Sequence, residues 1–174
     1  MPSRRRAGSG VGQFRQANGH AVTGDVPADR PGKLSPLTAK PTIVDADFVD
    51  AHRNRPGFRV VDARLPPFYD GEQTGGSAAA PHKTGHIANA GSVPHAALLD
   101  AEGRLKPRAE LEALFAQAGV KPGDTVVGYC HIGQQASAML FAARTLGYQT
   151  LLYDGSFEDW SRRPNAAVEV TKKV

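Results

Sequence analysis

The sequence has one cysteine, no long apolar run and, in most of its length, no excess of positive charge. A single cysteine excludes an internal disulfide and a cysteine-rich metal site. No apolar stretch approaches the roughly 18 residues that a membrane span needs. The basic start at Arg4–Arg6 is followed by no hydrophobic segment, so no secretory leader is expected. These absences predict a cytoplasmic protein with no membrane partner.

The basic charge is confined to the first 40 residues. Residues 1–40 hold seven Lys or Arg against two Asp, a net +5, whereas residues 41–174 hold fourteen basic against fifteen acidic side chains, a net −1. The body therefore lacks the positive excess that nucleic-acid binding requires, and no nucleic-acid partner is expected. Four prolines and the absence of a sustained period predict that residues 1–40 are a basic extension or linker.

Histidine spacing gives little support for a metal site. Of the six histidines, His82 and His86 have the i,i+4 spacing of ligands on one helix. Pro81 and Gly85 oppose a helix at that position, so the sequence predicts neither a metal nor a cofactor.

Residues 41–165 alternate short apolar runs with helical patterns. Strands are expected at residues 42–44, 58–61, 90–94, 124–129 and 149–153, and helices at 45–53, 107–118, 136–146 and 157–160. In the second helix, Pro107 suits the first helical position and Gly119 follows the last turn. Strands alternating with helices imply an α/β fold, in which helices cover both faces of a parallel sheet. Residues 166–174 are expected to be a C-terminal tail.

Cys130 lies at a chemically special place in this pattern, at the carboxyl end of a buried strand and directly before a helix. Ligands meet open α/β sheets at such ends, and the N–H groups at a helix start lower the pKa of a thiol. Gly133 can adopt positive φ, which lets the loop curl with its N–H groups inward. Cys130 is therefore predicted to be a nucleophile, with a small buried core residue as the alternative. The predicted cradle is His131, Ile132, Gly133, Gln134, Gln135 and Ala136.

Four segments together resemble the rhodanese superfamily of sulfurtransferases. They are Val60–Arg64 with Tyr69–Gly71, then Thr84–Ala90, the six-residue loop that begins at Cys130, and Tyr153–Trp160. The resemblance covers residues 41–165 and implies a three-layer domain with a five-stranded, mainly parallel sheet. The segment from Gly19 to Pro36 is similar to the linker of tandem sulfurtransferases, whose catalytic cysteine lies in the second half. The chain thus looks like that half, and an N-terminal rhodanese-like domain is its expected missing partner.

The resemblance implies a sulfurtransferase that works in two steps. The Cys130 thiolate takes a sulfur atom from thiosulfate or a similar donor, and the persulfide then gives it to cyanide or a thiol. Asp62, Arg64 and His131 are the candidates for binding the donor. The alternatives are a structural ion pair for Asp62 with Arg64, and an exposed loop residue for His131.

The loop departs from the best-known thiosulfate enzymes, which place cationic residues just after the cysteine. Here those positions are His131 and Ile132, and Phe68 stands where such enzymes have an arginine. The donor therefore stays open between thiosulfate and other carriers of sulfane sulfur.

Two other functions fit parts of the pattern. Dual-specificity phosphatases of related architecture have an arginine six positions after the cysteine, but Ala136 occupies that position here. The stronger alternative is a non-catalytic or partner-docked rhodanese module, in which Cys130 serves sulfur relay or redox sensing.

Overall fold

The computed structural model describes residues 17–21, 32, 41–75 and 82–171. The chain divides into two compact units, Met1–Ala39 and Lys40–Val174, and the second holds the fold described below. Most of the predicted extension, residues 1–40, lies outside the described residues. In the part of the chain that is described, no helix is long and apolar enough to cross a membrane.

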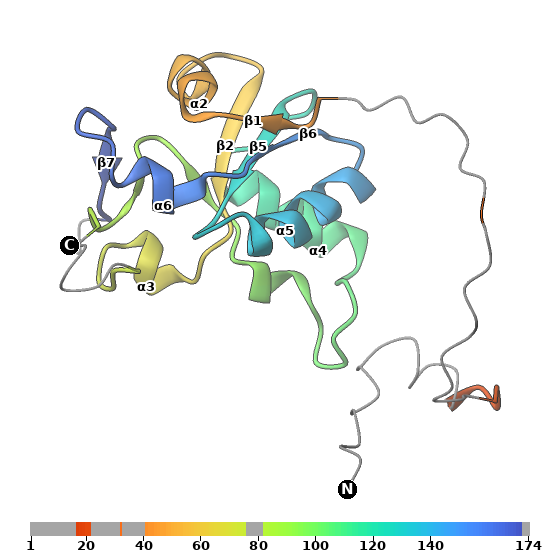
Figure 1. The fold of residues 1–174 in the computed structure, drawn as a ribbon. Helices are drawn as coiled ribbons and strands as arrows, with labels where there is room; N and C mark the ends of the chain where they lie inside the picture. Colours follow the sequence, from red (N-terminus) through yellow and green to blue (C-terminus); the bar gives the residue numbers. More distant parts are fainter. Residues whose placement is uncertain (1–16, 22–31, 33–40, 76–81, 172–174) are drawn as a thin grey trace, which may run out of the picture. The chain divides into compact units, whose positions relative to one another are not determined.

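Five parallel strands form the centre of the domain, in the order β1-β6-β5-β2-β4 (Figure 1). They are β1 (Ile43–Val44), β2 (Phe58–Asp62), β4 (Gly91–Ser92), β5 (Thr125–Tyr129) and β6 (Gln149–Tyr153). The register of β2 with β5 runs from Phe58↔Thr125 to Asp62↔Tyr129, so both strands end together. The strands of this sheet begin at one end of it and finish at the other. We call the end at Asp62 and Tyr129, where the strands finish, the carboxyl edge, and the end at Phe58 and Thr125, where they begin, the amino edge. The predicted α/β fold with a parallel sheet is confirmed.

Helices cover the two faces of this sheet and give the domain three layers (Figure 1). One face carries α4 (Arg108–Gln117) and α5 (Gln134–Thr145), and the other carries α2 (Ala46–His52) and α6 (Ser156–Trp160). Successive side chains of a strand point to opposite faces. Accordingly Val61 and Val126 join the buried cluster under α4 and α5, while Val60 and Val127 join the one under α2 and α6. This two-sided burial explains the continuous apolar runs of β2 and β5.

The helix ends follow local signals in the sequence. Asp45 caps α2, since its carboxylate accepts a hydrogen bond of 2.9 Å from the Phe48 N–H. Pro107 is the N-cap of α4 and not its first residue, because its extended backbone (ψ 147°) puts the helix start at Arg108. Gly119 ends that helix with φ at 79°. Helix α5 begins at Gln134, two residues before the apolar pattern predicts, because its first turn faces the Cys130 loop.

Several short elements of the fold were not predicted from the sequence as regular structure. β3 (His86–Ile87) pairs in antiparallel fashion with β7 (Val168–Glu169), so the segment expected as a tail, residues 166–174, contains a strand. A single turn of 3-10 helix, η1, spans His95–Leu98, and α3 spans Pro66–Tyr69 after β2. Two-residue strands are too short to show a hydrophobic period.

Candidate active site

The Cys130 loop joins β5 to α5 at the carboxyl edge of the sheet. Cys130 follows the last strand residue and is 1% exposed. Gly133 is the N-cap of α5 with φ at 88°, a left-handed conformation that favours glycine. A Cβ atom at Gly133 would also lie 2.9 Å from Asp154 Oδ1. The backbone conformation therefore favours glycine, while the Asp154 carboxylate, at the end of a flexible side chain, would have to move aside for any larger residue.

Two carbonyl groups of the loop are held by α6. The N–H of Phe157 donates to the Cys130 carbonyl at 3.0 Å, and the N–H of Glu158 donates to the His131 carbonyl at 3.1 Å. A trans peptide points its N–H opposite to its C=O, and no peptide bond is cis in the described residues. The N–H groups of His131 and Ile132 therefore point away from α6. Hydrogen bonds on one side of the loop thus set the direction of the N–H groups on the other.

The start of α5 supplies further N–H groups. The Ser137 N–H donates to the Gly133 carbonyl at 3.1 Å and is the first to bond in the helical pattern. The N–H groups of Gln134, Gln135 and Ala136 precede it and have no carbonyl one turn earlier in the helix. They form the positive end of a 12-residue helix directly after the cysteine. The loop and this helix start can together stabilise an anion on the Cys130 sulfur.

Ser156 is a site residue that the sequence reasoning missed. Its hydroxyl accepts a hydrogen bond of 3.2 Å from the Cys130 N–H and donates one of 2.9 Å to the Tyr153 carbonyl. The residue is fully buried and has φ at 53°, which is unusual for a residue with a side chain. Its position directly after Gly155 in the closing motif was the available signal, but nothing in the sequence showed which group the hydroxyl would meet.

Asp62 and Arg64 form a buried ion pair beneath the site. The Arg64 Nη2 lies 2.6 Å from Asp62 Oδ2, its Nε donates to both carboxylate oxygens, and Nη2 also donates to the Gly85 carbonyl at 2.7 Å. The two residues are 0% and 1% exposed. The Arg64 guanidinium also lies 4.0 Å from the centre of the Phe157 ring. This geometry supports the structural ion pair over direct donor binding, and donor binding by these two residues stays a prediction.

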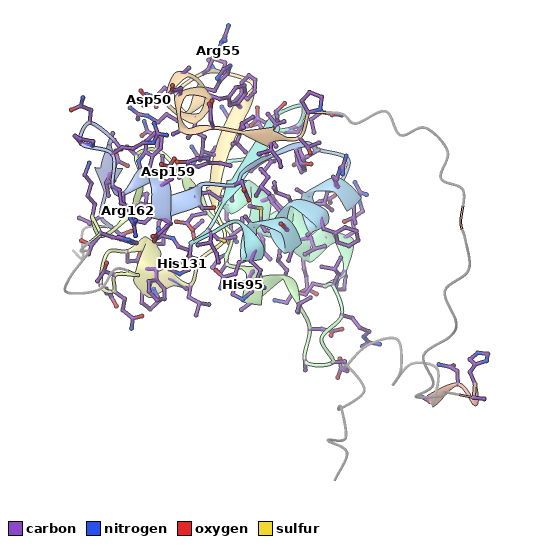
Figure 2. All side chains as sticks on the ribbon, in the orientation of Figure 1. Asp50, Arg55, His95, His131, Asp159 and Arg162 are labelled. Carbon is purple, nitrogen blue, oxygen red and sulfur yellow. The ribbon has the colours of Figure 1, made fainter. Side chains whose placement is uncertain are left out.

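His131 lies half-buried in the same region, with its ring edge-on to Phe68 at 4.6 Å between centroids. Burial, and next the charge of Arg64, lower the pKa of His131 below its usual value near 6.5. The imidazole is therefore neutral near pH 7. Figure 2 shows His131 and His95 at one end of the domain and Arg55 at the opposite end. His131 is therefore an uncharged ring within the Cys130 loop.

The other predicted cradle residues differ in what their side chains do. Ile132 is 64% exposed, Gln134 is exposed and Ala136 is fully buried. The Gln135 side-chain oxygen is buried and has no hydrogen-bond partner in the described part of the chain. Because the cradle requires only backbone N–H groups, such different side chains are compatible with it.

The comparisons with known proteins agree with this geometry. The profile of the rhodanese-like domain matches residues 45–163, which include both Asp62–Arg64 and the whole Cys130 loop. The chain belongs to the rhodanese-like family.

Two relatives illustrate the range within the family. The chain is 27% identical over 157 residues to a thiosulfate sulfurtransferase of Pseudomonas aeruginosa, covering 88% of this chain and 55% of the relative. It is 32% identical over 113 residues to a sulfur carrier protein of Thermus thermophilus, covering 58% of this chain and 37% of that one. The chain thus spans about half, or less, of the relatives that it matches.

Solved structures show the same fold. The anaerobic ergothioneine biosynthesis enzyme of Chlorobium limicola, in complex with trimethyl histidine, aligns with a TM-score of 0.78 at 24% identity. The alignment covers 92% of this chain and 40% of that enzyme. At this identity the likeness supports the three-layer fold of the rhodanese-like domain.

Proposed function

We propose that this domain is a sulfurtransferase that carries sulfane sulfur as a persulfide on Cys130. The observation that carries the proposal is the position of the cysteine, between the carboxyl end of β5 and the start of α5, in a loop whose peptides are oriented by α6. The match to the rhodanese-like family over residues 45–163 supports it.

The chemistry follows from the electrostatics of the loop. The Cys130 thiolate attacks the outer sulfur of thiosulfate, the sulfur–sulfur bond of the donor breaks, and sulfite leaves with the bonding electron pair. The negative charge then lies on the outer sulfur of the Cys130 persulfide, where the N–H groups of the loop stabilise it. A thiolate or cyanide ion attacks that outer sulfur, takes it away and restores the Cys130 thiolate. No acid or base is needed in either transfer when both reactants are ionised.

We propose thiosulfate or a similar small sulfane donor, with thiols or cyanide as acceptors. Arg64 is buried against Asp62, and the side chains after the cysteine are a neutral imidazole and Ile132. The backbone N–H groups are therefore the main attraction that this site offers to an anionic donor. Turnover should therefore be compared among donors of different charge, namely thiosulfate, mercaptopyruvate and glutathione persulfide.

The test is persulfide formation on the protein itself. A core cysteine and a shielded sulfur carrier are both buried, so the reactivity of the thiol separates them. Incubation with a sulfane donor should add the mass of one sulfur atom, and Cys130→Ser should abolish both this gain and turnover. Because Cys130 is the only cysteine, the variant has no other thiol to accept sulfur. Turnover that survives in Cys130→Ser would refute the proposal.

A second variant tests the cradle and keeps the thiol. Gly133→Ala places a Cβ atom 2.9 Å from Asp154 Oδ1 and disfavours the left-handed backbone. Misaligned N–H groups should slow persulfide formation by about 10²-fold, the usual loss when one anion-stabilising donor is removed.

The alternative function is a partner-docked module. Its signature is a persulfide that forms normally but is not discharged by small thiols or cyanide.

A further inference from the structure

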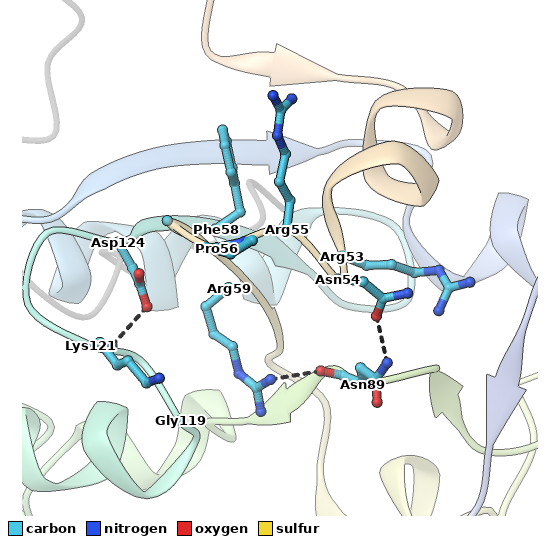
Figure 3. Close-up of a pocket in the computed structure, with 11 residues that line it drawn as sticks. Arg53, Asn54, Arg55, Pro56, Phe58, Arg59, Asn89, Gly119, Lys121 and Asp124 are labelled. Atoms are coloured by element: carbon cyan, nitrogen blue, oxygen red, sulfur yellow. Dashed lines mark hydrogen bonds between the residues drawn. The ribbon is translucent and has the colours of Figure 1, made fainter.

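A separate pocket of about 480 Å³ opens at the amino edge of the sheet (Figure 3). It is formed by the segment before β2, the first residues of β2, the loop at Asn89 and the turn that leads into β5. The five residues of β5 separate it from Cys130 by about 15 Å, because a strand rises about 3.3 Å per residue. The pocket is therefore distinct from the candidate active site.

Positively charged side chains outnumber carboxylates in this pocket. Arg53, Arg55, Arg59 and Lys121 line it, together with a single acidic residue, Asp124. Arg53 is paired with Asp50 at 2.9 Å. Among the described residues, no carboxylate lies within ion-pair distance of Arg55, Arg59 or Lys121. Residues 41–174 carry a net charge of −1, so this positive cluster is a local exception in the domain.

Arg59 is held in a fixed position at the centre of the pocket. Its Nε donates to the Ala118 carbonyl at 2.7 Å and its Nη1 donates to the Asn89 carbonyl at 2.9 Å. A guanidinium has five N–H donors in one plane, so three are left after these two bonds. The side chain is half-buried, and its rotamer is already selected by the two carbonyls. Binding an anion there costs little side-chain entropy.

The walls of the pocket are also ordered by hydrogen bonds. Asn89 has φ at 65°, its side-chain amide donates to Asn54 Oδ1 at 2.5 Å, and its N–H donates to Glu169 Oε2 at 3.0 Å. Figure 3 shows Lys121 and the Asn54–Asn89 pair on opposite sides of the Arg59 side chain, whereas Arg55 extends away from it. Arg59 and Lys121 are therefore the two cations that can contact the same ligand in the pocket.

We propose that this pocket binds the phosphate group of a small organic phosphate monoester. A planar guanidinium and a mobile ammonium together suit a tetrahedral dianion, the first as a two-donor fork and the second as a point charge. A cavity of 480 Å³ falls in the range of small-molecule sites and is larger than phosphate alone. Pro56 and Phe58 supply apolar wall for the organic part.

The test is an NMR titration of the full chain with inorganic phosphate, phenyl phosphate and acetate, each at constant ionic strength. We expect saturable amide shifts at residue 89, residues 119–121 and residues 123–124, with phenyl phosphate binding tightest and acetate weakest. Lys121→Gln should weaken phosphate binding about tenfold, as for the loss of one charge-assisted contact. Arg144→Gln is the matched control, since Arg144 is exposed, lies outside the pocket and carries the same charge; it should change the affinity less than twofold.

The outcomes separate this pocket from the sulfur-transfer site. Cys130→Ser should bind phosphate normally, so a failure of the proposed sulfur transfer leaves this proposal standing. Shifts that do not saturate, or equal weakening by Lys121→Gln and Arg144→Gln, would reduce the effect to general charge attraction and overturn it. Shifts confined to residues 130–136 would assign the phosphate to the active site, which also overturns it.

Discussion

The two edges of the sheet arrange their cationic side chains in opposite ways. At the carboxyl edge, the cation Arg64 is buried and paired with Asp62, and the proposed anion site consists of backbone N–H groups around Cys130. At the amino edge, the charged side-chain groups of Arg59 and Lys121 have no carboxylate within ion-pair distance in the described residues. Backbone donors have fixed positions, which suits stabilising a reacting atom, whereas side-chain cations suit binding a whole charged group.

The largest contrast is expected when a carboxylate is removed at each edge. Asp62→Ala leaves the Arg64 charge buried and unpaired, so it should lower the free energy of unfolding by about 3–5 kcal/mol. Asp124→Ala removes a partly exposed carboxylate that accepts one hydrogen bond of 2.8 Å from the backbone N–H of Lys121. It should cost only about 1 kcal/mol and should tighten phosphate binding. Denaturant unfolding of both variants gives the comparison. Equal losses in the free energy of unfolding would show that the Asp62–Arg64 pair is not a stabilising structural ion pair.

Arg64→Lys distinguishes a structural role of Arg64, in its ion pair with Asp62, from a role in binding the sulfur donor. Lysine keeps the charge but cannot form the forked contact with Asp62 and the bond to the Gly85 carbonyl together. If the pair holds the loops, kcat should fall more than KM rises for thiosulfate, by several-fold or more. A higher KM with unchanged kcat would instead support the donor-binding role that the sequence predicts for Arg64. Steady-state kinetics on the folded variant decides between them.

Two substitutions at Ser156 separate its hydroxyl from its backbone strain. Both Ala and Gly leave the buried Cys130 N–H without the Ser156 hydroxyl as a partner, which costs about 1–3 kcal/mol and should slow the reactions of the Cys130 thiol. Glycine also relieves the positive φ of 53°, worth about 1 kcal/mol, so Ser156→Gly should be the more stable variant. Unfolding measurements together with the alkylation rate of Cys130 at one fixed pH test this. An unchanged alkylation rate in both would show that the hydroxyl is only structural.

The sequence predicted the large elements because burial on both sides leaves long apolar runs. Examples are the strands predicted at residues 58–61 and 124–129. These elements also gave the position of Cys130 between a strand and a helix. Ser156 and the pairing of β3 with β7 were missed because they depend on contacts between distant segments, such as Ser156 with Cys130 and Ile87 with Val168. The pocket at Arg59 was missed for the same reason, since Asn89 and Ala118 lie 30 and 59 residues away in sequence.

The smallest expected effect is the pH dependence that His131 gives to stability. Burial, and then Arg64, lower its pKa in the folded protein, whereas in the unfolded chain it keeps a value near 6.5. Between these two values the unfolded chain binds more protons, so the free energy of unfolding falls as the pH drops through 6.5 and levels off below the folded pKa. In His131→Gln this loss should be absent.

The two proteins are best compared after each is referenced to its own stability at pH 8, where both the folded and the unfolded imidazole are neutral. Wild type should then lose more stability than His131→Gln between pH 7 and pH 5. Because the ring is only half-buried, solvent screening keeps the difference small. A wild type that gained stability relative to the variant on acidification would mean that the folded site favours the imidazolium. The carboxyl edge would then have a mobile cation of its own, and its contrast with the amino edge would be lost.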